Sequence, residues 1–207
     1  MNECPYLKNL EIWEIADRFR VSLGPGYSAP PIDTVAIAEI KLGLDLIEVP
    51  GLFTKIKMDA ALLPDLTGIY VDKKSYQGWE DYKPWIERRL RFSIAHELGH
   101  YELHRGLIKR IKPDSYAEFK SWAKKSTGLY PSPEYKADEF AGRLLVPFDS
   151  LISNYDEACR QAHSTDPNWR NRQQARRILA KKIAPRFGVN SGVIETRLDR
   201  EGIWPVD

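Results

Sequence analysis

Apolar residues recur at helical spacing in several separate segments of the 207-residue chain. Residues 6–20 place their apolar side chains on one face, which predicts an amphipathic helix. A second helix is expected from Asp33 or Thr34, since either residue can cap it, to about Leu42. Gly43 then follows the last helical residue, a position that glycine favours because it adopts the left-handed conformation easily.

Strands are expected where short apolar runs lie between turn residues. Leu44–Val49 is one such run, and Thr67–Asp72, which reads TGIYVD, is another. Residues 52–63 fit a strand and a turn, but their pattern is ambiguous. Residues 73–87 are rich in lysine and aromatic side chains. We expect them to form a loop held down by the aromatics or, alternatively, a wall or lid of a substrate cleft.

Helical patterns dominate the rest of the chain. Ser132 and Pro133 are typical of the first residues of a helix, and Val146 before a proline is typical of a helix end. Many helices and few strands predict a mainly helical α+β protein with a small mixed or antiparallel sheet and a C-terminal helical region. The expected helices cover 88–104, 114–125, 133–145 and 169–183, with a short one from about Asn190.

Composition and charge narrow the class of protein. Hydrophobic residues make up 43% of the chain and charged residues 29%, which is ordinary for a globular protein. The net charge of +2 does not by itself indicate a nucleic-acid partner. The two cysteines, Cys4 and Cys159, have no metal-binding spacing and fit a reducing compartment. Because no signal peptide or membrane-length apolar run is found, we expect a cytoplasmic protein with no membrane partner.

The segment 88–104 contains the pattern HExxH, formed by His96, Glu97 and His100. Residues four apart lie on one helix face, with Cβ atoms about 5–6 Å apart, so both imidazoles can bind one zinc ion. The glutamate then lies beside the metal, where hydrolysis needs a general base. The alternative is a helix face whose two histidines are solvated or satisfied in the core. Gly99 is costly inside a helix, so we expect another backbone close to it.

A catalytic zinc ion usually has three protein ligands, and Glu134 is the candidate for the third. It lies in the first turn of its expected helix, and Asp138 follows one turn later on the same face. The Asp138 carboxylate can accept the second ring N–H of a ligating histidine and so orient it. Acidic residues also favour the first turn of any helix through the helix dipole, so the spacing alone leaves both interpretations open.

Other polar residues near these motifs fit a ligand role less well. His104 continues the line of His96 and His100 but lies about 12 Å along the axis from His96, too far for one ion on a straight helix. We expect it to support a ligand or to pack. Glu102 points off the histidine face, and Glu139 lies about 100° around its helix from Asp138.

The two motifs are part of a longer resemblance. RRLRFSIAHELGHYELH at 88–104 and EYKADEFAGRLLVP at 134–147 resemble the ImmA/IrrE family of metallo-endopeptidases. The segments at 31–49, 67–72 and 180–203 are similar to flanking parts of that family, but more weakly. Before the motif helix, the segment 73–87 exceeds the usual spacing of the family, which implies a differently shaped cleft.

The resemblance implies a zincin-type fold in which His96, His100 and Glu134 bind one Zn²⁺ per chain and Glu97 is the catalytic base. Glu134-x-x-x-Asp138 also looks like the ExxxD motif of gluzincins. Many family members have asparagine in place of Asp138, and either residue can accept a hydrogen bond. Members of the family commonly accompany, and in some cases cleave, a helix-turn-helix repressor. They occur in mobile elements, stress responses and toxin–antitoxin-like pairs.

The expected function is zinc-dependent hydrolysis of a peptide bond, with a helix-turn-helix repressor encoded nearby as the expected substrate. The alternative is a regulatory or toxin–antitoxin-like binding protein that keeps the metal site and sequesters a repressor with little proteolysis. The strand at 67–72 is expected to be a sheet edge that binds extended substrate. Candidates for stabilising the oxyanion are Tyr70, Tyr101 and His104.

We expect two parts in the chain, a metallopeptidase domain at 1–155 and a basic helical region at 156–207. Residues 160–200 contain ten Lys/Arg and three Asp/Glu. The AxxxGV pattern at 184–189 loosely resembles a helix-turn-helix, so contact with DNA is an alternative. Pro185 is expected to break the first helix of such a motif, which favours docking to protein instead.

Overall fold

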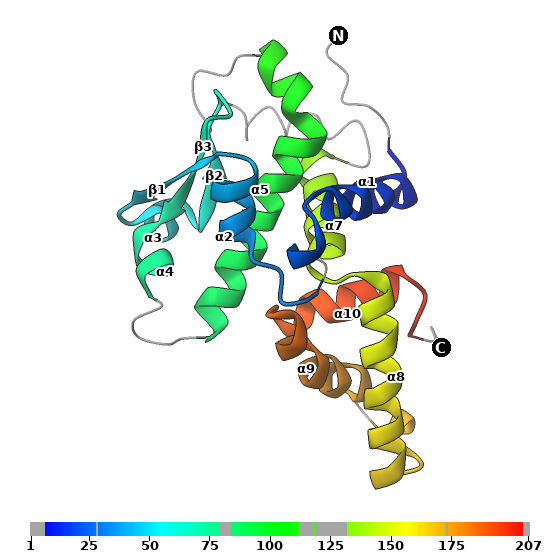
Figure 1. Cartoon of the computed structure of the whole chain (residues 1–207). Coiled ribbons are helices and arrows are strands. Elements are labelled where there is room, and N and C mark those ends of the chain that lie inside the picture. The colour runs from blue at the N-terminus through cyan, green and yellow to red at the C-terminus, as the bar shows by residue number, and fades with distance from the viewer. Residues whose placement is uncertain are drawn as a thin grey trace.

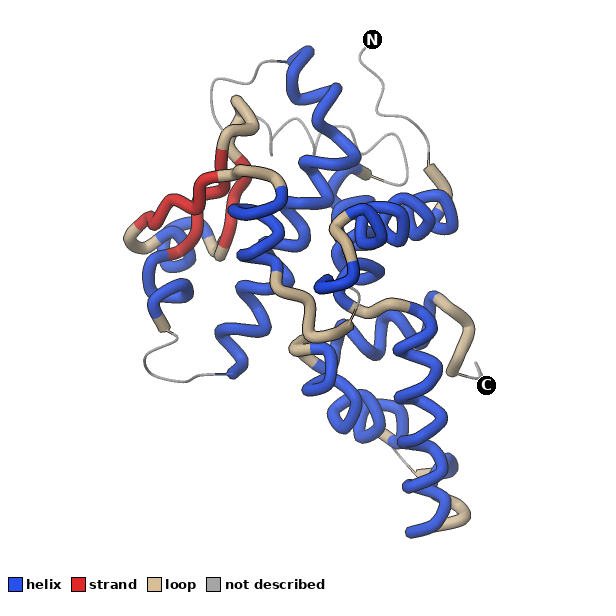
Figure 2. The backbone as a smooth tube through the Cα atoms, in the orientation of Figure 1, coloured by secondary structure: helices blue, strands red, loops and turns tan. Residues whose placement is uncertain are grey.

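The computed structural model describes residues 7–27, 29–78, 84–111, 118, 132–172 and 174–204. The described residues form three strands, and Figure 2 shows the strands together on one side of a mainly helical molecule. The expected class, mainly helical α+β with a small sheet, is therefore confirmed. None of the described helices is both long and apolar enough to cross a bilayer.

The first elements follow the predicted pattern closely. Helix α1 (Asn9–Ser22) buries one apolar face, and α2 (Thr34–Ala36) continues directly into a π-helical turn, η2 (Ile37–Lys41). Asp33 is the N-cap of α2, because its side chain accepts the backbone N–H of Ala36 at 2.9 Å. Strand β1 (Asp45–Val49) follows.

The sheet has three strands in the order β1-β3-β2. Helix α3 (Leu52–Ile56) and strand β2 (Ala60–Leu62) occupy the ambiguous segment, and β3 is Gly68–Asp72. β3 pairs with β1 in parallel and with β2 antiparallel, so the sheet is mixed. The expectation that 67–72 forms a sheet edge is wrong, because β3 has a partner on each side. Among the described strands, β2 is the edge next to α5.

The described parts of the segment 73–87 are mainly helical, not the loop that its composition suggested. Helix α4 (Lys73–Gln77) forms because the Asp72 carboxylate accepts the backbone N–H of Ser75 at 3.0 Å and so caps it. Helix α5 (Pro84–Ile111) begins before the predicted start of the motif helix, with proline in its first turn. Residues 79–83, and all but one residue of the helix expected at 114–125, lie outside the described residues.

The C-terminal half consists of helices. α7 (Pro133–Leu145) starts as predicted, with the Ser132 hydroxyl accepting the N–H of Tyr135 at 3.3 Å. It is followed by four further elements, which Figure 1 places below the sheet: α8 (Phe148–Thr165), η4 (Trp169–Asn171), α9 (Ala175–Phe187) and α10 (Ser191–Arg200). α8 was not anticipated, and the helix expected at 169–183 is a 3-10 turn followed by α9.

Pro185 does not break α9, contrary to the expectation. The helix continues to Phe187 and ends at Gly188, whose φ of 60° is left-handed. Proline removes only the hydrogen bond to the carbonyl of Lys181, and both residues are exposed, so water can solvate that carbonyl. α9 and α10 pack together. One hydrophobic cluster contains Leu151, which precedes the predicted domain boundary at 155/156, and Leu198, which follows it. The proposed division at 155/156 falls within α8 and stays a prediction.

Candidate metal centre

The centre is built where α5 and α7 cross. α5 buries Leu90, Ile94 and Leu98 in the core, which fixes the rotation of the helix about its axis. His96 and His100 consequently lie one above the other and face α7. The His96 side chain is 12% exposed and that of His100 is fully buried.

The expected ligand atoms converge. His96 Nε2 and His100 Nε2 are 3.0 Å apart, and the two Glu134 oxygens lie 3.5 Å from His96 Nε2 and 3.4 Å from His100 Nε2. All three residues offer ligand atoms within 4.8 Å of one another. A tetrahedral site with bonds of about 2.0–2.1 Å has edges of about 3.3 Å between ligands. The residues present therefore fit a metal ion of the zinc type.

Gly99 allows α7 to come this close. A Cβ atom on Gly99 would lie 3.1 Å from both Cα and the carbonyl oxygen of Ala137, and 3.2 Å from the ring of Phe140. The predicted close approach of another backbone is thus confirmed. Since Ala137 lies between Glu134 and Asp138, the absence of a side chain on α5 sets the distance of both acids from the histidines.

Asp138 orients His96. Its Oδ1 lies 2.8 Å from His96 Nδ1, which leaves Nε2 of that ring toward His100 and Glu134. Burial lowers the pKa of His96, but the hydrogen bonds to Asp138 and Glu134 outweigh burial and raise the pKa to about 9. The arrangement gives Asp138 the supporting contact that the one-turn spacing suggested.

His100 has a different partner. Its Nδ1 lies 3.0 Å from Nδ1 of His104, which is buried one turn further along α5. Burial lowers the pKa of His100, with the hydrogen bond to Glu134 opposing it. Burial also lowers the pKa of His104 well below its usual range, and the neighbouring imidazole of His100 and the ammonium group of Lys136 disfavour a second positive charge there. Both rings are therefore neutral in this environment.

Glu97 is buried and contacts the strand β2. Its Oε2 accepts the backbone N–H of Leu62 at 2.8 Å, and the residue is 2% exposed. Along an antiparallel strand, successive backbone N–H groups point to opposite sides. The N–H of Leu63 donates to the carbonyl of Gly68 in β3, so the N–H of Leu62 points away from β3. The contact of Leu62 could not be predicted from the sequence, because a three-residue strand is too short to show a period.

The oxyanion candidates are not brought together. His104 faces His100 inside the core, whereas Tyr70 is half-buried on the central strand β3. Tyr101 is half-buried as well, with the Arg105 guanidinium 5.3 Å from its ring centroid. Neither tyrosine hydroxyl forms a hydrogen bond with the centre among the described contacts.

A cavity of about 220 Å³ lies beside Asp138, between α5, α7 and α10. Phe92, Gly142, Val193 and Thr196 are among its lining residues. Glu139, Arg197 and Arg200 line it as well, so α10 borders a cavity that extends from Asp138 toward the other side of α7. α10 also packs against α7 and α9, which favours a role in the packed fold over insertion into a nucleic-acid groove.

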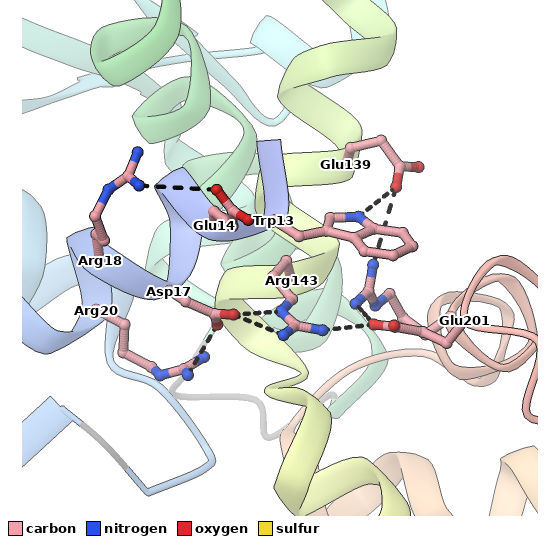
Figure 3. Close-up of polar contacts among 9 residues, drawn as sticks. Trp13, Glu14, Asp17, Arg18, Arg20, Glu139, Arg143 and Glu201 are labelled. Atoms are coloured by element: carbon pink, nitrogen blue, oxygen red, sulfur yellow. Dashed lines mark hydrogen bonds and ion pairs between the residues drawn. The ribbon is translucent and has the colours of Figure 1, made fainter. Parts of the chain in front are cut away.

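The opposite face of α7 carries a second polar cluster, here named the arginine junction, which joins α7 to α1 and α10 (Figure 3). Glu139 is 1% exposed and accepts the Trp13 indole N–H at 2.8 Å. Arg143 bonds Asp17 at 2.6 Å and Glu201 at 2.7 Å. The remaining members are Arg197, which bonds Glu201, and Arg200, which bonds Glu139. Glu139 thus points away from the metal centre, as predicted.

Comparison with known proteins agrees with this geometry. A peptidase family model described as the IrrE N-terminal-like domain matches residues 87–199, from the start of α5 nearly to the end of α10. A comparison with curated proteins gives no match. The match covers both motifs and the C-terminal helices, whereas the weaker resemblance at 31–72 lies outside it. Since it spans more than half of the chain, the protein belongs to the IrrE N-terminal-like peptidase family, the one that the sequence resembled.

Proposed function

We propose that this protein is a zinc-dependent endopeptidase that binds one Zn²⁺ through His96, His100 and Glu134. The observation that carries the proposal is the convergence of these three side chains at distances that match the edges of a tetrahedral site. Two imidazoles and one carboxylate are a typical donor set for catalytic zinc in peptidases, with a further position left for water. Membership of a peptidase family supports the same conclusion.

The ion, when bound, polarises the scissile carbonyl and lowers the pKa of a water molecule toward neutrality. The chain supplies the proton transfers. Glu97 follows His96 directly on α5, which brings its carboxylate beside the ligand set, and the N–H of Leu62 fixes one carboxylate oxygen. We assign Glu97 the role of general base, which accepts the proton of the attacking water and delivers it to the leaving amine.

The contacts of the site indicate the reaction more directly than they indicate the substrate. The strand β2 is buried beside α5, and the N–H of Leu62 already donates to Glu97, so β2 does not offer a free edge to an extended peptide. Membership of a peptidase family is what supports a protein substrate. By its family resemblance we propose a helix-turn-helix repressor encoded beside this gene as that substrate.

The test is to incubate the zinc-loaded protein with that repressor and to identify fragments by mass spectrometry. We expect cleavage that a chelator abolishes and added Zn²⁺ restores. Glu97→Gln should bind zinc with unchanged stoichiometry but lower the cleavage rate roughly 10²–10⁴-fold. Glu102→Gln, the same change on the same helix but off the histidine face, is the matched control and should leave the rate unchanged.

Two other outcomes would contradict the proposal. Cleavage that survives Glu97→Gln excludes this glutamate as the base. Complex formation with the repressor but no cleavage, unaffected by Glu97→Gln, would instead support a binding protein that acts by sequestration.

A further inference from the structure

His104 contacts His100, and the proposed mechanism gives this contact no role. It is 1% exposed, and its ring lies against that of His100, with centroids 5.1 Å apart and planes at 47°. The Nδ1 atoms of the two rings are 3.0 Å apart. At that distance two ring nitrogens share one hydrogen, since one must donate and the other accept.

The ligand role of His100 fixes the direction of this hydrogen bond. Its Nε2 faces His96 Nε2 and Glu134, so the lone pair of Nε2 is needed for the metal. A neutral imidazole carries one N–H, which must then be on Nδ1 of His100. This N–H donates to Nδ1 of His104, and His104 in turn carries its hydrogen on Nε2.

We propose that His104 is a positioning residue, which holds His100 in the tautomer that binds metal and fixes the orientation of its ring. This inference rests on the metal site of the proposed function, but not on peptide hydrolysis. It also gives the third histidine of the H-E-x-x-H-x-x-x-H run a role that is neither ligand nor simple packing.

The choice of histidine over a carboxylate follows from burial. His96 is oriented by Asp138, whose side chain is 52% exposed, so water can solvate the negative charge. The partner of His100 lies in the core, where an additional carboxylate would be costly to bury. A neutral imidazole supplies the acceptor without that charge.

The test compares zinc affinities measured by competition with a chelating indicator. His104→Leu removes the acceptor and should weaken zinc binding roughly 10–100-fold, as loss of a ligand's hydrogen-bond partner generally does. His104→Asn places its amide oxygen near the position of Nδ1 and should restore most of the affinity. His163→Leu, at an exposed histidine of α8, is the control and should match the wild-type protein.

A second measurement needs no variant and decides the question if His104→Leu does not fold. The chain has four histidines, so ¹⁵N NMR of the zinc-loaded protein can assign each ring. We expect a protonated Nδ1 and a metal-bound Nε2 in His100, and an unprotonated Nδ1 in His104. A Cobalt(II) spectrum that is the same in wild type and His104→Asn would confirm that His104 is not a ligand.

The outcomes separate this inference from the proposed function. A wild-type protein that binds no Zn²⁺ contradicts the metal site itself. Wild-type affinity in His104→Leu, equal weakening in His104→Asn and His104→Leu, or a hydrogen on Nδ1 of His104 contradicts only the role of this histidine.

Discussion

The two faces of α7 carry acidic residues with different partners. Toward α5, Glu134 and Asp138 lie against imidazoles, at 3.4–3.5 Å and 2.8 Å. Toward α1 and α10, Glu139 lies against the Trp13 indole and the guanidinium groups of Arg197 and Arg200. Acidic residues therefore serve two purposes on one helix, within six consecutive residues.

The difference lies in what compensates the negative charge. In the arginine junction, cations built into the chain pair with the acids, and Arg197 also stacks 4.8 Å from the Trp13 ring centroid. Burial lowers the pKa of Arg197 to about 10, against the opposing effect of Glu201, which still leaves it charged at neutral pH. In the metal centre the partners are histidines, which can exchange a proton for a metal ion. A junction of the first kind stabilises the fold, and one of the second kind can bind a ligand.

The largest effect on stability is expected at Glu139. Glu139→Gln keeps an acceptor for Trp13 but removes the carboxylate that pairs with Arg200, and it leaves Arg197 with Glu201 alone. Removing one partner of a buried ion pair costs about 3–5 kcal/mol. Urea unfolding of the metal-free protein should show this loss, whereas zinc affinity should hardly change. If the free energies of unfolding and of zinc binding fall by the same amount, the two faces of α7 are coupled.

The converse result is expected at Glu134. Glu134→Gln preserves the shape of the side chain but removes the charge of a metal ligand, so zinc affinity should fall by more than the roughly 10–100-fold typical of outer partners. The side chain is 24% exposed and pairs with a protonated His96 only below about pH 9, so above that pH the unfolding free energy of the metal-free protein should change little. A large loss of stability without metal would instead make Glu134 a structural residue like Glu139.

Sequence alone indicated the cluster of His96, His100 and Glu134 but not the arginine junction, for a physical reason. Ligands on one helix are tied to the 3.6-residue period, so His96 and His100 could be read from their spacing, and the Ser132–Pro133 start of α7 set the register of Glu134. The junction joins Trp13, Glu139 and Arg197, which are far apart in the chain. No local period connects such residues, and only the packed fold brings them together.

The same reasoning explains the errors in the sheet. The TGIYVD strand was recognised from its composition, but strand order depends on pairing partners that composition does not specify. β2, at Ala60–Leu62, was too short to identify, so the edge was assigned to the wrong strand and the contact of Leu62 with Glu97 was missed.

The pH dependence of metal binding should separate the two regions further. The metal-free His96 has a pKa of about 9 and must lose its proton to bind metal through Nε2. Apparent zinc affinity should therefore rise about tenfold per pH unit from pH 7 and level off above pH 9. The raised pKa also stabilises the metal-free fold below pH 6.5, a contribution lost as the pH rises through about 9.

Asp138→Asn is the variant that checks this cause. The amide keeps a hydrogen-bond acceptor for His96 but removes the negative charge, so the pKa of His96 should fall. The affinity profile of this variant should level off at a lower pH than that of the wild-type protein, as measured by competition with a chelating indicator. An unchanged midpoint would mean that Glu134, not Asp138, raises the pKa.

The finest test of the comparison is expected at Gly99. In Gly99→Ala the new Cβ meets the Ala137 backbone at 3.1 Å, so α7 must shift by a few tenths of an ångström. Overpacking costs about 1–3 kcal/mol, and the better helix propensity of alanine offsets about 1 kcal/mol of it. The matched control is Gly106→Ala, on the same helix with open space at its Cβ, which should gain stability and keep its zinc affinity.

The shift of α7 acts on the two faces unequally. Glu134 and Asp138 flank the point of contact and must keep their distances from His96 and His100, so Gly99→Ala should weaken zinc binding. Long arginine side chains in the junction can follow a small displacement by changing rotamer, so the unfolding free energy should fall less than the binding free energy. If Gly99→Ala strongly lowers the unfolding free energy but leaves zinc affinity unchanged, the close approach of α5 and α7 supports the core and not the ligand geometry.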